Sequence, residues 1–171
     1  MAASDSTNED PAWDVVHHIS NYYDVPLQGV ANVNGVPHVF FLHDEHYCRV
    51  KEDPQAPDNE DDDWETHLTY ALYAVPSRLL DALMEKNEIF ERWHRAYRQD
   101  ARLMDAHPAL PEDRPRYQSL QAEVKPALEA LQKTPPAQVL MGRFRTSERR
   151  LPPGSSRWIG FDVAWAPAPG Q

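Results

Sequence analysis

The sequence predicts an α+β domain in which an antiparallel β-sheet of about five strands packs against two main helices. Three observations support this prediction. An Asn-Gly pair separates two apolar runs near the start, a long central segment repeats its apolar residues at helical spacing, and the chain returns to strand-like alternation near its end. Because strands and helices come in separate blocks, an antiparallel sheet packed on helices is favoured over alternating β–α units.

The size and composition are typical of one globular domain. The chain has 171 residues, of which 41% are hydrophobic and 26% are charged, so it can bury a core without disulfides. We expect residues 1–11 to be a disordered acidic N-terminus, residues 12–166 to form a single α+β domain, and residues 167–171 to be a flexible tail.

The chain is acidic, with a formal net charge of −10 at pH 7 and a pI of about 5.2. Such a chain lacks the clustered Lys and Arg that bind nucleic acid, and anionic membrane surfaces repel it. Its only cysteine, Cys48, cannot form an internal disulfide, which favours a reducing cytoplasm. Because we also find no transmembrane run and no signal-peptide pattern, we expect a cytoplasmic protein without membrane or nucleic-acid partners.

Residues 13–23 are predicted to form a short helix. Their apolar side chains recur at steps of three and four residues, which indicates one face of a helix. This face consists of Val15, Val16, Ile19, Tyr22 and Tyr23.

Three strands are expected next. Asn34-Gly35 is the kind of dipeptide that most strongly favours a two-residue hairpin turn, so residues 29–34 and 36–43 are predicted to be paired antiparallel strands. An acidic run at 57–63 is expected to be a solvated loop. After it, residues 66–76 alternate along the chain and are rich in Thr and Tyr, which predicts a third strand.

Residues 77–99 carry the clearest helical pattern in the chain. Ser77 follows Pro76 and is expected to cap the helix N-terminus. Glu88–Arg92 and Glu91–Arg95 have the i,i+4 order that favours ion pairs. The predicted apolar stripe consists of Leu79, Leu80, Leu83, Met84, Asn87, Phe90, Trp93 and Tyr97.

A second helix is expected after a proline-rich loop. Asp113 can cap its N-terminus, and its stripe consists of Tyr117, Leu120, Val124, Leu128 and Leu131. Pro126 lies inside this pattern, so a kink or break is predicted near residue 125.

The last part of the chain is predicted to be a β-hairpin. Residues 137–147 and 156–168 alternate in polarity, and the Leu-Pro-Pro-Gly-Ser stretch at 151–155 forms the turn between them. The face of the final strand that points to the core is expected to carry Ile159, Phe161, Val163 and Trp165.

Three stretches resemble a family of small uncharacterised bacterial proteins. They are YYDVPLQGVANVNGVPHVFFLHDE at 22–45, NEIFERWHRAY at 87–97 and HPALPEDRPRY at 107–117. The resemblance covers roughly residues 21–165. It implies a bacterial source and a compact α+β domain, and it implies no activity. Where the family pattern continues with acidic or aromatic residues after the Pro-His strand, this chain has His43, His46 and Cys48, so a site built on them would be peculiar to this chain.

The stretch HVFFLHDEHYCRVKED, residues 38–53, holds the densest set of potential metal ligands. On a strand, His43 and Glu45 lie on the same side, and His46 can join them if the strand ends there. Imidazole and carboxylate groups are zinc ligands, so these three residues form a candidate metal site. Cys48 would join it only if a turn folds the chain back.

The alternative for this stretch is a strand with a polar end. In that interpretation Phe40 and Leu42 face the core, and residues 43–46 are solvated. The alternative is favoured because the chain has no Cys-x-x-Cys or His-Glu-x-x-His pattern to complete a metal site. We therefore expect no cofactor.

The sequence best fits a non-enzymatic protein-interaction module with an acidic surface, such as an immunity-like protein. A basic protein is the expected partner, since an acidic surface attracts it. The expected contact residues are Asp44, Glu45, Asp61, Asp62 and Asp63. Two alternatives stay open, a metal-dependent hydrolase that uses His43, Glu45 and His46, and a small-molecule-binding module.

Overall fold

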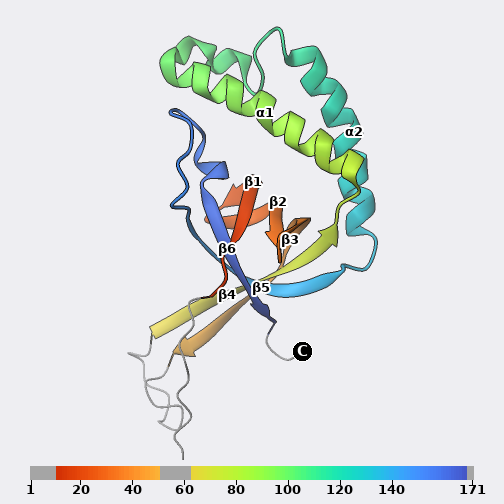
Figure 1. Ribbon diagram of the computed structural model, residues 1–171, viewed down its shortest axis with the longest axis vertical. Coiled ribbons are helices and arrows are strands. Elements are labelled where there is room, and N and C mark those ends of the chain that lie inside the picture. The colour runs from red at the N-terminus through yellow and green to blue at the C-terminus, as the bar shows by residue number, and fades with distance from the viewer. Residues whose placement is uncertain (1–10, 51–62, 169–171) are drawn as a thin grey trace, which may run out of the picture.

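Six antiparallel strands close into a barrel in chain order, and two helices lie against its outside (Figure 1). The computed structural model describes residues 11–50 and 63–168. The strands are β1 (Asp14–Tyr23), β2 (Val25–Val33), β3 (Val36–Val50), β4 (Asp63–Ala74), β5 (Gln138–Thr146) and β6 (Phe161–Pro167). The helices α1 (Ser77–Gln99) and α2 (Arg114–Gln132) lie between β4 and β5, with short 3₁₀ turns η1 (Ala101–Ala106) and η2 (Arg157–Ile159). The α+β class is confirmed, whereas the prediction of five strands in an open sheet is wrong.

The additional strand is β1, whose residues the sequence pattern predicted to form a short helix. Its pairing with β2 shifts register at three points, between Val16 and His18, between Ile19 and Asn21, and between Asn21 and Tyr22. Each shift changes which face the following side chains meet. The apolar residues therefore lose their two-residue alternation and fall at spacings that imitate a helix.

The predicted hairpins are confirmed. Asn34 and Gly35 have φ values of 51° and 79°, the left-handed geometry that a tight turn between twisted strands requires. The Asp14 carboxylate accepts hydrogen bonds from the N–H groups of Asn34 and Gly35 at 2.9 and 3.1 Å. β5 and β6 also pair as expected, but β6 begins only at Phe161, because residues 157–159 form η2.

The barrel closes through a short seam between its first and last strands. β1 pairs with β6 only at Asp14 and Val15, opposite Val163 and Asp162. Arg149 reinforces this seam, because its guanidinium donates to the carbonyls of Val16 at 3.3 Å and Phe161 at 2.8 Å. β6 runs to Pro167 and residue 168 is buried, so the ordered strand reaches into the range 167–171 that was expected to be a tail.

Aromatic rings fill the barrel interior. Phe40, Tyr70, Phe144 and Trp165 contact one another with ring centroids 5.4 to 6.5 Å apart. These separations suit the edge-to-face and tilted packing that aromatic pairs prefer. The Phe161, Val163 and Trp165 face of β6 belongs to this core as predicted.

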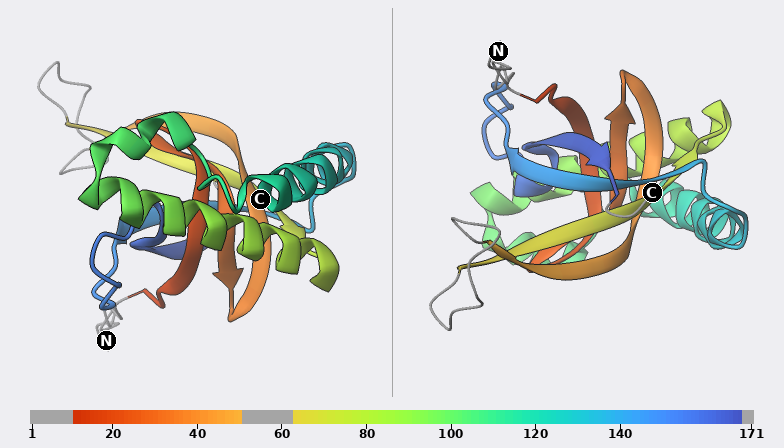
Figure 2. Two further views of the ribbon diagram at one scale, coloured as in Figure 1. Left: turned by 90° about the horizontal axis from the view of Figure 1, so that it is seen from above. Right: turned by 90° about the horizontal axis from the view of Figure 1, so that it is seen from below.

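A second core lies between the outside of the barrel and the helices. The outward side chains of β2, β3 and β4 pack against α1 and α2, and Figure 2 shows α1 lying across the strands. These strands are buried on both faces. Runs such as Val39-Phe40-Phe41 are therefore apolar without alternation, because odd and even positions meet different cores.

Both predicted helices form, but the predicted N-terminal caps are absent, and Asp113 forms an ion pair instead. The N-cap of α1 is Pro76, and no side chain caps it, so Ser77 is already helical. Asp113 does not cap α2 with its side chain but binds the Arg92 guanidinium at 2.8 and 3.1 Å.

α2 continues through Pro126 without a break. Pro126 is exposed, so the unpaired carbonyl one turn earlier can bind water instead of costing a buried hydrogen bond.

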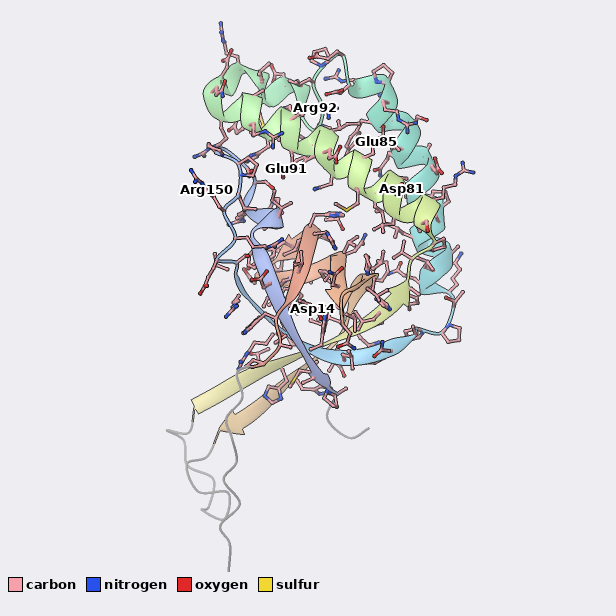
Figure 3. The ribbon with its side chains drawn as sticks, in the orientation of Figure 1. Asp14, Asp81, Glu85, Glu91, Arg92 and Arg150 are labelled. Carbon is pink, nitrogen blue, oxygen red and sulfur yellow. The ribbon has the colours of Figure 1, made fainter. Side chains whose placement is uncertain are left out.

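Glu91 ties α1 to the connection between β5 and β6 (Figure 3). Its side chain is buried, and its carboxylate accepts hydrogen bonds from Ser156, from the backbone N–H at 3.0 Å and from the hydroxyl. Arg95 lies 4.0 Å away, so the predicted Glu91–Arg95 pair is present. The dominant partner of Glu91 is nevertheless Ser156, which is also buried.

Replacing Glu91 with Leu is expected to lower the free energy of unfolding by about 2 kcal/mol, because two buried donors of Ser156 lose their acceptor. Urea denaturation of the purified variant measures this change. Glu88→Leu is the matched control, since Glu88 is exposed on the same helix. Equal losses in the two variants would contradict a structural role for the Glu91 carboxylate.

Candidate functional site

The predicted metal ligands lie on an exposed strand end. β3 shifts register between Leu42 and Asp44, and residues 43–46 are exposed, so the polar strand end expected as the alternative is observed. His46 pairs with Asp44, with Nε2 and Oδ2 3.0 Å apart. Among the described side chains, no three His, Cys, Asp or Glu groups come close enough together to hold a metal ion. The trio His43, Glu45 and His46 is therefore not assembled as a metal site.

The predicted partner-binding acids are placed only in part. Asp44 and Glu45 are exposed on β3. Asp61 and Asp62 lie outside the described residues, and Asp63 is the first residue of β4. The large exposed apolar side chains of the described residues are Tyr23, Val36 and Met104, which come from two hairpin turns and η1.

A cavity of about 410 Å³ opens between β1 and the two helices. This volume lies in the range of small-molecule pockets. Apolar side chains from all sides line it, including Ile19, Leu83, Phe90, Leu128 and Trp158. Its polar lining comes from His18, Ser20, Asn21, Tyr22, Gln28, Lys86, Asn87, His107 and Tyr117. The wall is therefore mixed, with apolar surface that can bury a ligand and polar groups that can orient it.

His18 is the most unusual residue of this cavity. Only 5% of it is exposed, and its Nδ1 is the one buried side-chain polar atom of the described residues that has no hydrogen-bond partner. Burial is the main cause that lowers the pKa of His18 to about 4, and the charges of Lys86 and His17 contribute to the same shift. The imidazole is therefore neutral at pH 7, and its Nδ1 is a hydrogen-bonding nitrogen that the protein leaves unused.

Lys86 brings a positive charge to the same cavity. It is partly buried, and this burial lowers the pKa of its ammonium group. Its Nζ lies 5.3 Å from the centroid of the Tyr117 ring, close enough for a cation–π contact. Burial also raises the pKa of Tyr117, so the phenol keeps its proton and remains a hydrogen-bond donor at neutral pH.

The fold brings these groups together from distant parts of the chain. His18 lies opposite Val30 in the β1–β2 ladder, and Val30 belongs to the core under the helices. His18 therefore points to the helical layer and not into the barrel. α1 and α2 pack across this face and place Lys86 and Tyr117 above it.

The function of a protein can be inferred from related proteins whose function is known. Comparison with protein families, with curated proteins and with solved structures finds no match to this chain. The candidate site therefore rests on its own geometry. None of the helices that the structure describes is long and apolar enough to cross a membrane.

A second cavity, of about 600 Å³, lies where β4 separates from β5. Its apolar lining includes Leu68, Phe144 and Trp165, and its charged lining residues Asp24 and Arg143 are exposed. Among its described lining atoms none is a buried polar group without a partner. The first cavity is therefore the stronger candidate, because its polar groups have hydrogen-bonding capacity that the protein leaves unused.

Neither His18 nor Lys86, the two residues that define the first cavity, was predicted as a site residue. Lys86 lies three residues after Leu83 and four before Phe90, which places it within the apolar stripe of α1. A lysine inside such a stripe is a usable signal for a polar group at a buried interface. His18 carried no comparable signal, because its segment was interpreted as a helix.

Proposed function

We propose that this protein is a small-molecule-binding module whose ligand occupies the cavity between β1 and the helices. The observation that carries the proposal is a cavity of ligand size whose described lining includes His18 and the partly buried ammonium group of Lys86. A partly buried charge without an opposite charge beside it is costly. A bound molecule that pairs with it recovers this cost, so the site favours occupancy.

The chemistry of the cavity supports binding more than catalysis. Nucleophilic catalysis needs a nucleophile beside a base that a third group orients. Of the two histidines in the described cavity lining, His107 packs edge-on against the Trp93 ring, and His18 has a pKa of about 4 and an Nδ1 without a partner. We therefore consider His18 as the hydrogen-bonding group of the site. Such an imidazole is a weak base but a suitable neutral hydrogen-bonding group.

A protein-interaction role through Asp44 and Glu45 stays a prediction. Both side chains are exposed, as contact with a basic partner requires. Most surface carboxylates share this property, so exposure alone favours the role only weakly. The cavity offers the more specific feature.

Filling the cavity is expected to abolish ligand binding. A library of small fragments is screened against the full-length protein by ligand-observed NMR, and hits are then tested on Leu128→Trp. Leu128 lines the cavity, so the larger side chain should displace the hits. Leu131→Trp is the matched control, because Leu131 is also partly buried on α2 but lines a different surface pocket.

The expected result is that hits bind the wild-type protein and Leu131→Trp but not Leu128→Trp. Circular dichroism establishes that both variants are folded before the comparison is made. Hits that bind Leu128→Trp as well as wild type, or a screen without hits, would overturn the proposed function.

A further inference from the structure

We propose that the ligand of this cavity is an organic monoanion, a carboxylic acid with a flat apolar body, whose charged end is held by Lys86 and His18. The inference rests on the proposed function and adds the chemical class of the ligand. Three features of the site support it, namely the charge of its lining, the pairing of the surrounding carboxylates, and the shape of its apolar wall.

The charged lining of the cavity is basic, whereas the chain as a whole is acidic. The chain carries 27 acidic and 17 basic residues, yet none of the described lining residues is Asp or Glu. Lys86 supplies the positive charge, since His18 is neutral at pH 7. A partly buried ammonium group without a carboxylate beside it is costly. An anionic ligand would remove that cost.

Four carboxylates of the helical layer are bound to other groups. Glu85 accepts from Arg116 at 2.7 Å, and Asp113 accepts from Arg92 at 2.8 Å. Glu123 accepts from Arg78 at 3.0 Å, and Glu91 binds Ser156. Figure 3 labels three members of this network along α1, Glu85, Glu91 and Arg92. The carboxylate that Lys86 lacks in the protein is the group that we assign to the ligand.

His18 provides the directional part of the recognition. His18 lines the cavity, and a ring nitrogen that faces the ligand donates to a carboxylate oxygen when it carries the imidazole proton. A hydrogen bond to a charged acceptor is roughly twice as strong as one between neutral groups. One ammonium and one neutral imidazole match a single negative charge better than a dianion, which would keep half of its charge unpaired in a partly apolar cavity.

The rest of the lining fits a flat apolar body. Phe90 and Trp158 present aromatic surface to the cavity, and Ile19 and Leu128 present aliphatic surface. Aromatic rings bury a large area and stack with planar groups. A volume of about 410 Å³ accommodates an aromatic acid of one or two rings, in keeping with ordinary ligand pockets.

The test compares three probes of similar shape and different charge, benzoate, benzyl alcohol and benzylammonium. Their dissociation constants for the full-length protein are measured by NMR titration at pH 7. We expect benzoate to bind at least about ten-fold more tightly than benzyl alcohol, the ratio that a charged hydrogen bond of modest strength gives. Benzylammonium should bind most weakly, because Lys86 repels it.

The variants Lys86→Met and Lys133→Met identify the source of this preference. Lys133 is exposed at the C-terminal end of α2 and does not line the cavity. Lys86→Met should bind benzoate and benzyl alcohol equally, whereas Lys133→Met should keep the wild-type preference. Met preserves the length and apolar stem of Lys, so the cavity keeps its shape.

The outcomes separate the two proposals. If benzyl alcohol binds as tightly as benzoate and Leu128→Trp displaces both, the cavity is a ligand site and the anion assignment is wrong. If benzylammonium binds best, or if Lys86→Met keeps the benzoate preference, the assignment is also wrong. If none of the probes binds and the fragment screen gives no hits, both proposals fail.

Discussion

Acidification from pH 7 to pH 4 is expected to lower the free energy of unfolding by roughly 3 kcal/mol through His18 alone. The pKa of His18 is about 4 in the folded protein, chiefly because of its burial, against an ordinary value of 6.5. Between these two values the unfolded chain binds a proton that the folded chain does not. Stability from this group is therefore complete above about pH 7 and is lost as the pH falls toward 4.

Urea denaturation at pH 7 and pH 4 tests this expectation. In His18→Phe, which keeps a flat ring and cannot be protonated, the difference between the two pH values should shrink by roughly 3 kcal/mol relative to wild type. His43→Phe is the control, because His43 is exposed on β3. Carboxylates with lowered pKa values, such as Asp100 and Asp113, add the same pH dependence to all three proteins. Equal pH dependence in His18→Phe and wild type would show that His18 is accessible to protons in the folded state.

Gly29→Ala should destabilise the protein by about 3 kcal/mol or more, the upper end of the cost of overpacking. Gly29 lies on β2 opposite Ile19 of β1 and Phe40 of β3. A Cβ at this position would meet the His18 carbonyl oxygen and would lie 2.6 Å from the Phe40 ring. The carbonyl belongs to the paired backbone of β1, so it cannot move away without breaking the ladder between the strands.

Gly35→Ala separates this steric effect from the conformational freedom of glycine. Gly35 has a φ of 79° and no atom within 4 Å of an added Cβ, so its replacement costs only the left-handed backbone strain of about 1–2 kcal/mol. Guanidinium denaturation of both variants gives the comparison. A cost at Gly29 no larger than at Gly35 would mean that β1 and β2 adjust to the added methyl group and would refute the close approach described above.

Local signals in the sequence predicted most of the elements but not the closed barrel. Asn34-Gly35 fixed one hairpin because only a few dipeptides adopt two successive positive φ values. The apolar stripe of α1 could be recognised because apolar residues recur at helical spacing along the whole helix. β1 was missed because its register shifts remove the alternation by which a strand is recognised. Without β1 the second edge of β6 has no partner, and the sheet cannot close.

The candidate site could be predicted less well than the fold. The density of His and acidic residues at 43–46 marked a stretch that the structure places at an exposed strand end. The cavity instead combines His18 with Lys86, which lie far apart in the sequence and belong to no recognised motif. Their proximity depends on the packing of α1 across β1, a tertiary contact that periodicity and spacing do not encode.

The short seam between β1 and β6 makes the barrel depend on both ends of the described chain. The other five pairs join strands that follow one another in chain order, so they can form without bringing the two ends of the described chain together. β1 must wait for β6, the last described strand along the chain. Until then the nascent sheet has exposed edges, and unpaired edges are the usual starting point of aggregation. The barrel is therefore most vulnerable to misassembly before β6 reaches β1 and closes it.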